Sequence, residues 1–175
     1  MHPIEIEEAM KTFEIIVDTR EQKWQHIESA LAATQTPYER CKLNYGDYSC
    51  KVTKSDNSPL SLSERLVIER KANLDELAGN FTKGRSRFDR EFKRALENKA
   101  KVFLLIENAS WDDIEQHHYR SQFPSKSYLA TLYSWQAKYN ITIIFCKSEQ
   151  SGNIIKGILW YAMKNYLSKV GDMKC

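Results

Sequence analysis

The sequence contains few of the residues that mark a disordered chain. Among 175 residues there are six glycines and four prolines, whereas 42% of the residues are hydrophobic. This composition is typical of a folded globular protein and excludes intrinsic disorder. A chain of this length forms one domain that can bury a core without disulfides or a structural metal.

Cysteine is also scarce, and the four cysteines form neither a disulfide framework nor a zinc site. No Cys-x-x-Cys pair is present, and no second cysteine or histidine lies at the spacing of zinc ligands. Cys41 and Cys50 could face each other across a hairpin. In a reducing compartment we expect them to be small apolar side chains instead.

No hydrophobic run approaches the roughly 18 residues of a transmembrane helix. The longest candidates, residues 101–106 and 141–146, have the length of buried strands. The first ten residues include Glu5, Glu7 and Glu8, where a signal peptide would have basic residues and an apolar run. We therefore expect an intracellular protein without a membrane partner, in the cytoplasm of a prokaryote or of a phage-infected cell, or in a nucleus.

The hydrophobic pattern alternates between strand and helix periods, without repeats or linkers. Strands are expected at residues 13–18, 38–43, 47–53, 62–71, 101–107 and 141–146, and helices at 4–11, 22–34, 73–79, 86–98, 127–139 and 153–167. Turn formers separate the strands between residues 38 and 71, which predicts an antiparallel meander. A meander followed by alternating helices and strands predicts an α/β fold of three layers with a central mixed sheet.

Charged side chains occur at the ends of predicted strands, where solubility alone does not explain them. Asp47 follows Gly46 at the start of one predicted strand, and Glu69-Arg70-Lys71 closes a later one. Because strand side chains alternate, Glu69 and Lys71 project from one face about 7 Å apart along the backbone, and Arg70 projects from the other. An acid and an amine are thus expected on one surface, with Asp47 nearby.

More carboxylates are expected at the same edge of the sheet, from Asp18, Glu21 and Asp75. Carboxylates that converge repel one another unless a cation lies among them, and Mg²⁺ with oxygen ligands meets that need. A bound Mg²⁺ activates water and neutralises charge on a phosphate. These residues indicate metal-assisted phosphodiester hydrolysis in which Lys71 holds the attacking water or stabilises the pentavalent phosphorus. The alternative interpretation of Glu69 and Lys71 is a solvated strand face.

The order and spacing of these residues resemble the nuclease domain of the XPF-type structure-specific endonucleases. The matching segments are Val17-Asp18-Thr19-Arg20-Glu21, Gly46-Asp47-Tyr48 and Glu69-Arg70-Lys71-Ala72-Asn73-Leu74-Asp75. The match continues at Arg87-Phe88, at Glu91 and in the strand at residues 103–107, so it covers about residues 13–146. Glu91 departs from the pattern, because many members of the family have glutamine there.

The resemblance implies a restriction-endonuclease-like core, a requirement for Mg²⁺ or Mn²⁺, and cleavage of branched DNA such as flaps and forks in repair or recombination. It implies that Asp47, Glu69 and Asp18 hold the metal and that Lys71 is the catalytic lysine. Arg70 would anchor the site by ion pairing. The supporting positions are Glu21, Arg70, Asp75 and Arg20.

We expect a single nuclease domain over residues 1–175, with the motif-bearing core at about 13–146 and a C-terminal helix at 152–168. This leaves no room for the tandem helix-hairpin-helix module with which larger family members grip DNA, so a separate DNA-binding partner is a further expectation. Two other interpretations stay open. One is a catalytically silent DNA-binding or scaffolding subunit, and the other is a nuclease of the same fold that cuts plain duplex in restriction, recombination or phage DNA processing.

Positive charge is concentrated between residues 83 and 101, although the whole chain has a net charge of only +3. We expect three cations next to the motif to contact DNA phosphates beside the scissile bond: Lys83, Arg85 and Arg87. Later cations of the same run are expected to form a solvated helix face: Lys93, Arg94 and Lys99.

The last predicted helix carries a wider apolar band than one packing face needs. The band consists of Ile154, Ile155, Ile158, Leu159, Trp160, Tyr161, Ala162 and Leu167. Part of it must cover the sheet. The surplus, with Tyr133 and Trp135 of the preceding helix, predicts a homodimer through the C-terminal helices.

Overall fold

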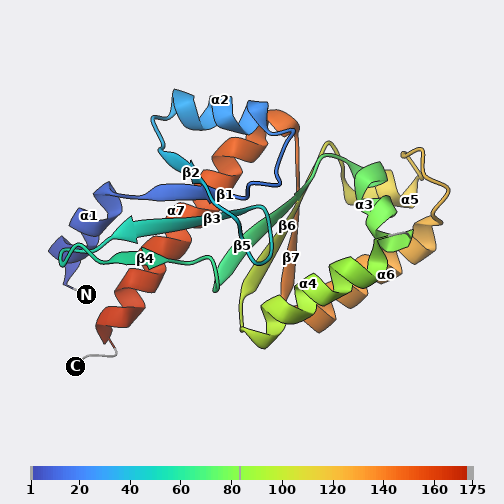
Figure 1. Ribbon diagram of the computed structural model, residues 1–175. Helices are drawn as coiled ribbons and strands as arrows, with labels where there is room; N and C mark the ends of the chain where they lie inside the picture. Colours follow the sequence, from blue (N-terminus) through green and yellow to red (C-terminus); the bar gives the residue numbers. More distant parts are fainter. Residues whose placement is uncertain (1, 83, 173–175) are drawn as a thin grey trace.

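The computed structural model describes residues 2–82 and 84–172, which fold around one seven-stranded sheet (Figure 1). In chain order the elements are α1 (Pro3–Lys11), β1 (Glu14–Val17), α2 (Gln25–Ala33), β2 (Tyr38–Arg40), β3 (Tyr48–Thr53), β4 (Pro59–Ser61), β5 (Leu66–Lys71), α3 (Leu74–Thr82), α4 (Arg85–Glu97), β6 (Lys101–Glu107), α5 (Trp111–Glu115), α6 (Ser125–Tyr139), β7 (Ile141–Cys146) and α7 (Ser148–Asp172). The predicted α/β fold with a central mixed sheet is confirmed.

The strand order is β2-β1-β3-β5-β6-β7, with β4 paired to β3. Strands β5, β6 and β7 run parallel, and β1 is parallel to β2 but antiparallel to β3. The expected antiparallel meander is wrong for its first strand, because helix α2 returns the chain so that β2 pairs with the outer side of β1, whereas β3 pairs antiparallel with β4 and, as expected, with β5. Ile15 of β1 lies between Tyr38 and Cys50. Cys41 and Cys50 thus do not face each other, and both are free.

Helices cover both faces of the sheet and give the molecule three layers (Figure 1). One hydrophobic core lies under α1, α2 and α7, and the other lies under α3, α4, α5 and α6. Val67 and Ile68 of β5 belong to opposite cores, since neighbouring strand residues point to opposite faces. Each layer therefore buries the apolar stripe that its sequence period predicts.

The aromatic side chains of α3, α4 and α6 fill the second core. The ring of Trp135 lies 5.0–5.1 Å from the rings of Phe81, Phe88 and Phe92, and all four residues are buried. Placing Trp135 on a self-association surface was wrong, because its large apolar ring completes this cluster. Tyr133, two residues earlier, is exposed. Of the helices in the described ranges, none is long and apolar enough to cross a membrane.

A narrow junction joins the two halves of the sheet. Strands β3 and β5 share one residue pair, Tyr48 with Ile68, whereas β5 and β6 pair along six residues. Other hydrogen bonds also cross the junction: among them, Asp47 N donates to Ile68 O at 2.8 Å, and Ser49 Oγ donates to Leu66 O at 2.8 Å. The junction therefore holds Asp47 against the end of β5.

Candidate active site

The turn that presents Asp47 requires glycine at position 46. Gly46 has a φ of +70°, and a Cβ atom there would lie 2.7 Å from the Val67 Cβ atom. Only glycine adopts this backbone conformation readily and leaves that space free. The turn brings Asp47 Oδ2 within 2.8 Å of the Arg70 backbone N–H, which donates to it. The acid from the start of β3 is thereby fixed beside Glu69.

Glu69 and Lys71 lie on one face of β5, as strand alternation predicts. Lys71 Nζ donates to Glu69 Oε1 at 2.7 Å, and it also lies 5.0 Å from the centre of the Phe88 ring. Both charged residues are buried. Burial lowers the pKa of Lys71, but the negative charges of Glu69 and Asp47 outweigh burial and raise that pKa above its usual value. Lys71 is therefore a cation at neutral pH.

Glu69 is buried and Asp47 is half-buried, so both acids lie where the protein shields them from much of the solvent. Burial, followed by the charge of Glu69, holds the pKa of Asp47 well above its usual range. Glu91 adds a third acid from α4, and its Oε1 accepts a hydrogen bond from Gly46 N at 3.1 Å. Burial and the charge of Glu69 raise the pKa of Glu91 as well. Three acids thus approach one another with Lys71 as the buried cation among them.

The chemistry of these side chains fits a hard divalent cation. In the described part of the chain, no three histidine, cysteine or acidic side chains gather tightly enough to enclose a metal by themselves. Mg²⁺ needs no such cage, because it keeps several waters and binds one or two carboxylates together with a substrate phosphate. Asp47 and Glu69 supply two carboxylates of this kind.

Asp18 is buried at the end of β1, and both of its oxygens accept hydrogen bonds from protein groups. Oδ1 accepts from Arg20 N and Arg20 Nε at 2.7 Å, and Oδ2 accepts from Leu43 N at 2.6 Å and Arg20 Nη2 at 3.0 Å. Burial alone would raise the pKa of Asp18. The hydrogen bonds from Arg20 and Leu43 outweigh burial, so the pKa lies below its usual value. Asp18 thus ties β1 to the segment before Asp47, and its role as a metal ligand stays a prediction.

Arg70 points to the opposite face of β5 and forms a buried ion-pair network behind the site. Its Nη1 donates to Glu107 Oε2 at 2.7 Å, and its Nη2 donates to Glu21 Oε1 at 2.7 Å and to Lys23 O at 2.8 Å. His26 Nε2 lies 2.8 Å from the other Glu107 oxygen. Arg70 therefore connects both halves of the sheet at the junction.

Glu91 and Glu107 lie in segments that resemble the XPF-type nucleases, but neither was predicted to have a role in the site. Glu107 ends β6, which runs parallel to β5, so its position beside the Glu-Arg-Lys segment follows from strand pairing. A carboxylate at the end of an apolar strand was the available signal. Glu91 reaches the site because Phe88 and Phe92 face the core and turn α4 so that Glu91 meets Gly46. No local pattern shows that packing.

Asp75 anchors a loop beside the site. Its Oδ1 accepts hydrogen bonds from Arg120 N at 2.8 Å and from Ser121 N at 2.7 Å. Burial alone would raise the pKa of Asp75. The hydrogen bonds from Ser121 and Arg120 outweigh burial, so the pKa lies below its usual value. The hydrogen bonds that Asp75 makes within the described ranges go to this loop, and a supporting role in catalysis stays a prediction.

The three cations expected to contact DNA are described to different extents. Lys83 lies outside the described residues, as does the side chain of Arg85, whose backbone begins α4. Arg87 is exposed one helical turn before Glu91, and its charge attracts the Glu91 carboxylate. Their contact with DNA stays a prediction.

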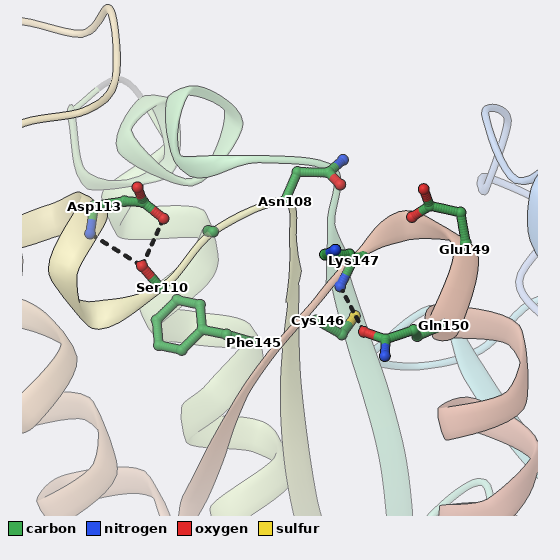
Figure 2. A pocket seen from close by; sticks show the side chains of 9 residues that line it. Asn108, Ser110, Asp113, Phe145, Cys146, Lys147, Glu149 and Gln150 are labelled. Carbon is green, nitrogen blue, oxygen red and sulfur yellow. Dashed lines mark hydrogen bonds between the residues drawn. The ribbon is translucent and has the colours of Figure 1, made fainter.

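A separate hollow of about 680 Å³ lies at the carboxyl ends of β6 and β7 (Figure 2). Several of its polar groups bond to one another, since Ser110 Oγ donates to Asp113 Oδ2 and Lys147 N donates to Gln150 Oε1 (Figure 2). Its lining consists of Asn108, Ala109, Ser110, Asp113, Phe145, Cys146, Lys147, Glu149 and Gln150. None of the predicted catalytic residues lines it, so the candidate active site stays at the β3–β5 junction.

Comparisons with known proteins bear on the family and the fold. Residues 17–158 match the family model described as the ERCC4 domain. XPF from Aeropyrum pernix is structurally similar, with a TM-score of 0.62 and 21% sequence identity over 85% of this chain and 61% of that chain. XPF from Aeropyrum pernix in complex with DNA has a TM-score of 0.62 and 20% identity over 87% of this chain and 66% of that chain.

The chain therefore spans less than two thirds of the length of either XPF chain. A search of curated proteins gives no match. At these identities the structural likeness establishes the fold, and the predicted restriction-endonuclease-like core of the XPF type is confirmed.

Proposed function

Because the chain belongs to the ERCC4-domain family, we propose that it is a divalent-metal-dependent DNA endonuclease that hydrolyses phosphodiester bonds. The observation that carries this proposal is the contact between Lys71 Nζ and Glu69 Oε1 next to Asp47 at one end of β5. A buried lysine beside the buried Glu69 and the half-buried Asp47 is costly for stability, and two carboxylates next to a lysine are groups that can hold a divalent metal and assist phosphodiester hydrolysis. The similar XPF structure determined with DNA supports DNA as the substrate.

Asp47 and Glu69 would hold Mg²⁺ or Mn²⁺, which when bound activates water and neutralises charge on the scissile phosphate. The chain's own groups then position the reactants. Lys71, whose pKa is raised by Glu69 and Asp47, would donate hydrogen bonds to the attacking water or to a phosphate oxygen. The Arg70 backbone N–H orients Asp47, while the Arg70 side chain is held by Glu21 and Glu107 behind the strand.

The proposed substrate is branched DNA, such as a flap or a fork, in repair or recombination. The support for this preference is the resemblance of the Gly-Asp and Glu-Arg-Lys-x-x-x-Asp segments to the XPF-type nucleases. A separate DNA-binding partner belongs to the same proposal. Plain duplex is the competing substrate, and a catalytically silent DNA-binding subunit is the competing function.

We propose further that the protein is a homodimer. The strand β7 is an edge of the sheet, its apolar residues 143–145 are partly exposed, and α6 and α7 lie on either side of it. An unpaired apolar edge favours association with another chain. Tyr133 and Tyr161 add exposed aromatic surface on these two helices. A monomeric mass in light scattering at micromolar concentration would contradict the dimer.

One assay tests the nuclease function. Flap, fork, linear duplex and single-stranded DNA are incubated with Mg²⁺ or with EDTA, using the wild type, Asp47→Ala and the control Asp56→Ala, which changes an exposed loop acid. We expect Mg²⁺-dependent cleavage that Asp47→Ala abolishes and Asp56→Ala retains. Absence of cleavage with every substrate contradicts the enzyme and favours the silent subunit. Equal cleavage of plain duplex contradicts the preference for branched DNA.

A further inference from the structure

The outer face of α4 carries a basic groove that the proposed reaction does not use. A hollow of about 420 Å³ is lined by four cations and one acid: Arg87, Arg90, Lys93, Arg94 and Glu97. All five side chains are exposed, whereas Phe88, Phe92 and Ala95 of the same helix are buried in the core. The helix thus keeps one apolar and one basic face.

The basic groove carries an excess of positive charge. Its lining carries three net positive charges, which equals the +3 of the whole chain, so the remainder of the molecule is neutral overall. Arg90, Lys93 and Arg94 form no ion pair with any residue in the two described ranges. Cations that lack an internal partner are free to bind an external polyanion.

The basic groove begins at the candidate active site. Arg87 lies one turn before Glu91, which accepts the Gly46 N–H next to Asp47. From Arg87 to Arg94 the helix advances about 10 Å at roughly 1.5 Å per residue. That length covers about three nucleotides of one DNA strand, at roughly 3.4 Å each along the duplex axis. A strand that leaves the catalytic acids can therefore continue along the groove.

We propose that the basic groove binds the sugar–phosphate backbone of DNA that flanks the scissile bond. This inference rests on the proposed function for the identity of the anion. Arg90, Lys93 and Arg94 then belong to the substrate surface, in contrast to the solvated face expected for the later cations of this run. Backbone contacts position DNA without reading its sequence, so the groove serves substrates of any sequence.

The test measures binding without cleavage. Fluorescence anisotropy in EDTA follows a labelled fork and a labelled duplex between 50 and 200 mM salt, for the wild type and for Arg90→Gln/Lys93→Gln/Arg94→Gln. We expect the affinity of the triple variant to fall about tenfold or more and the slope of log K against log salt to decrease by about 2–3. Arg94→Gln alone should reduce the slope by about 1.

The matched control removes the same number of charges from the opposite layer of the molecule, with Lys156→Gln/Lys164→Gln/Lys169→Gln on α7. Its affinity and salt slope should stay within about twofold of the wild type. Equal losses of affinity in the two triple variants would overturn the proposal that the groove binds DNA, because net charge alone would then explain binding. Tighter binding of an RNA duplex of the same sequence, with the same dependence on the groove cations, overturns the assignment to DNA.

DNA binding by the basic groove and nuclease activity can be tested independently. If the wild type binds DNA through the groove but cuts no substrate with Mg²⁺, the groove stands and the nuclease fails. If the wild type cuts DNA and the groove variant binds and cuts like the wild type, the groove fails and the nuclease stands. Thermal melting of each variant should match the wild type, since all the changed side chains lie outside the buried core.

Discussion

Lys71 Nζ lies 2.7 Å from Glu69 Oε1 on one face of β5, and the residue between them, Arg70, points to the other face. One strand thus separates the face of the candidate active site from the face of the buried ion-pair network. The two faces predict different outcomes for substitutions at neighbouring positions.

Lys71→Ala should reduce turnover by about a hundredfold or more, because the cation that meets the developing charge is removed. Binding of DNA in EDTA should stay within about twofold of the wild type, since the basic groove is intact. The measurements are single-turnover cleavage and anisotropy. An equal loss of binding and turnover would contradict a role for Lys71 in the chemical step.

Arg70→Met should lower the free energy of unfolding by about 3–5 kcal/mol, because Glu21 and Glu107 are left as buried acids without their partner. Urea denaturation measures the change. Adding Glu107→Gln to this variant should recover part of the loss. If the double variant is less stable than the single one, the ion pairs are not the source of the effect.

Glu91→Gln and Glu91→Ala separate the effect of the hydrogen bond that Glu91 accepts from the effect of its negative charge. Glutamine keeps an oxygen for the Gly46 N–H and removes a charge that Glu69 repels, so we expect melting in EDTA at or above the wild-type temperature. Alanine leaves that N–H without its partner and should cost about 1–3 kcal/mol. Glu97→Gln on the outer face of α4 is the control. Equal destabilisation by glutamine and alanine would show that the charge itself is needed.

Gly46→Ala should destabilise the protein by about 1–3 kcal/mol and reduce cleavage, because the new Cβ meets Val67 and the backbone has a positive φ. Gly79→Ala is the matched control. It lies in α3 with no atom within 4 Å of the added Cβ, so it should be neutral or stabilise by up to about 1 kcal/mol. A harmless Gly46→Ala would contradict the described turn.

Asp18→Asn should show a deficit in stability that depends on pH. The pKa of Asp18 is lowered by Arg20 and Leu43, so its charged form contributes stability above the ordinary value of about 4. That contribution is lost as the pH falls through the folded-state value. We expect a deficit of about 1–3 kcal/mol at pH 7 that narrows below pH 4, measured by urea denaturation. Asp112→Asn, at an exposed site, should show neither effect.

Local pattern predicts some parts of this molecule well. The hydrophobic runs at 101–107 and 141–146 coincide with β6 and β7, because both strands are apolar along their length and end at polar residues. The alternation at Glu69, Arg70 and Lys71 predicts which side chains share a face. These features depend only on neighbours in the chain.

Other features depend on partners that are distant in the chain. Alternation predicts a strand at residues 38–43, of which Tyr38–Arg40 form β2, but it does not show that β1 lies between β2 and β3. The segment at Pro59–Ser61 has turn formers before it and pairs as a short strand only because β3 offers an edge. Glu91 enters the site through the packing of α4, which no spacing rule contains.

The narrow junction between β3 and β5 has a consequence for how the protein loses activity. Asp47 N and Arg70 N, the amides whose hydrogen bonds hold Asp47 in place, are also among the groups that connect the two halves of the sheet. Separation of the halves and disassembly of the site are therefore the same event. Amide hydrogen exchange at these two positions should accelerate at the denaturant concentration where cleavage stops, before exchange begins in the six-residue ladder of β5 and β6.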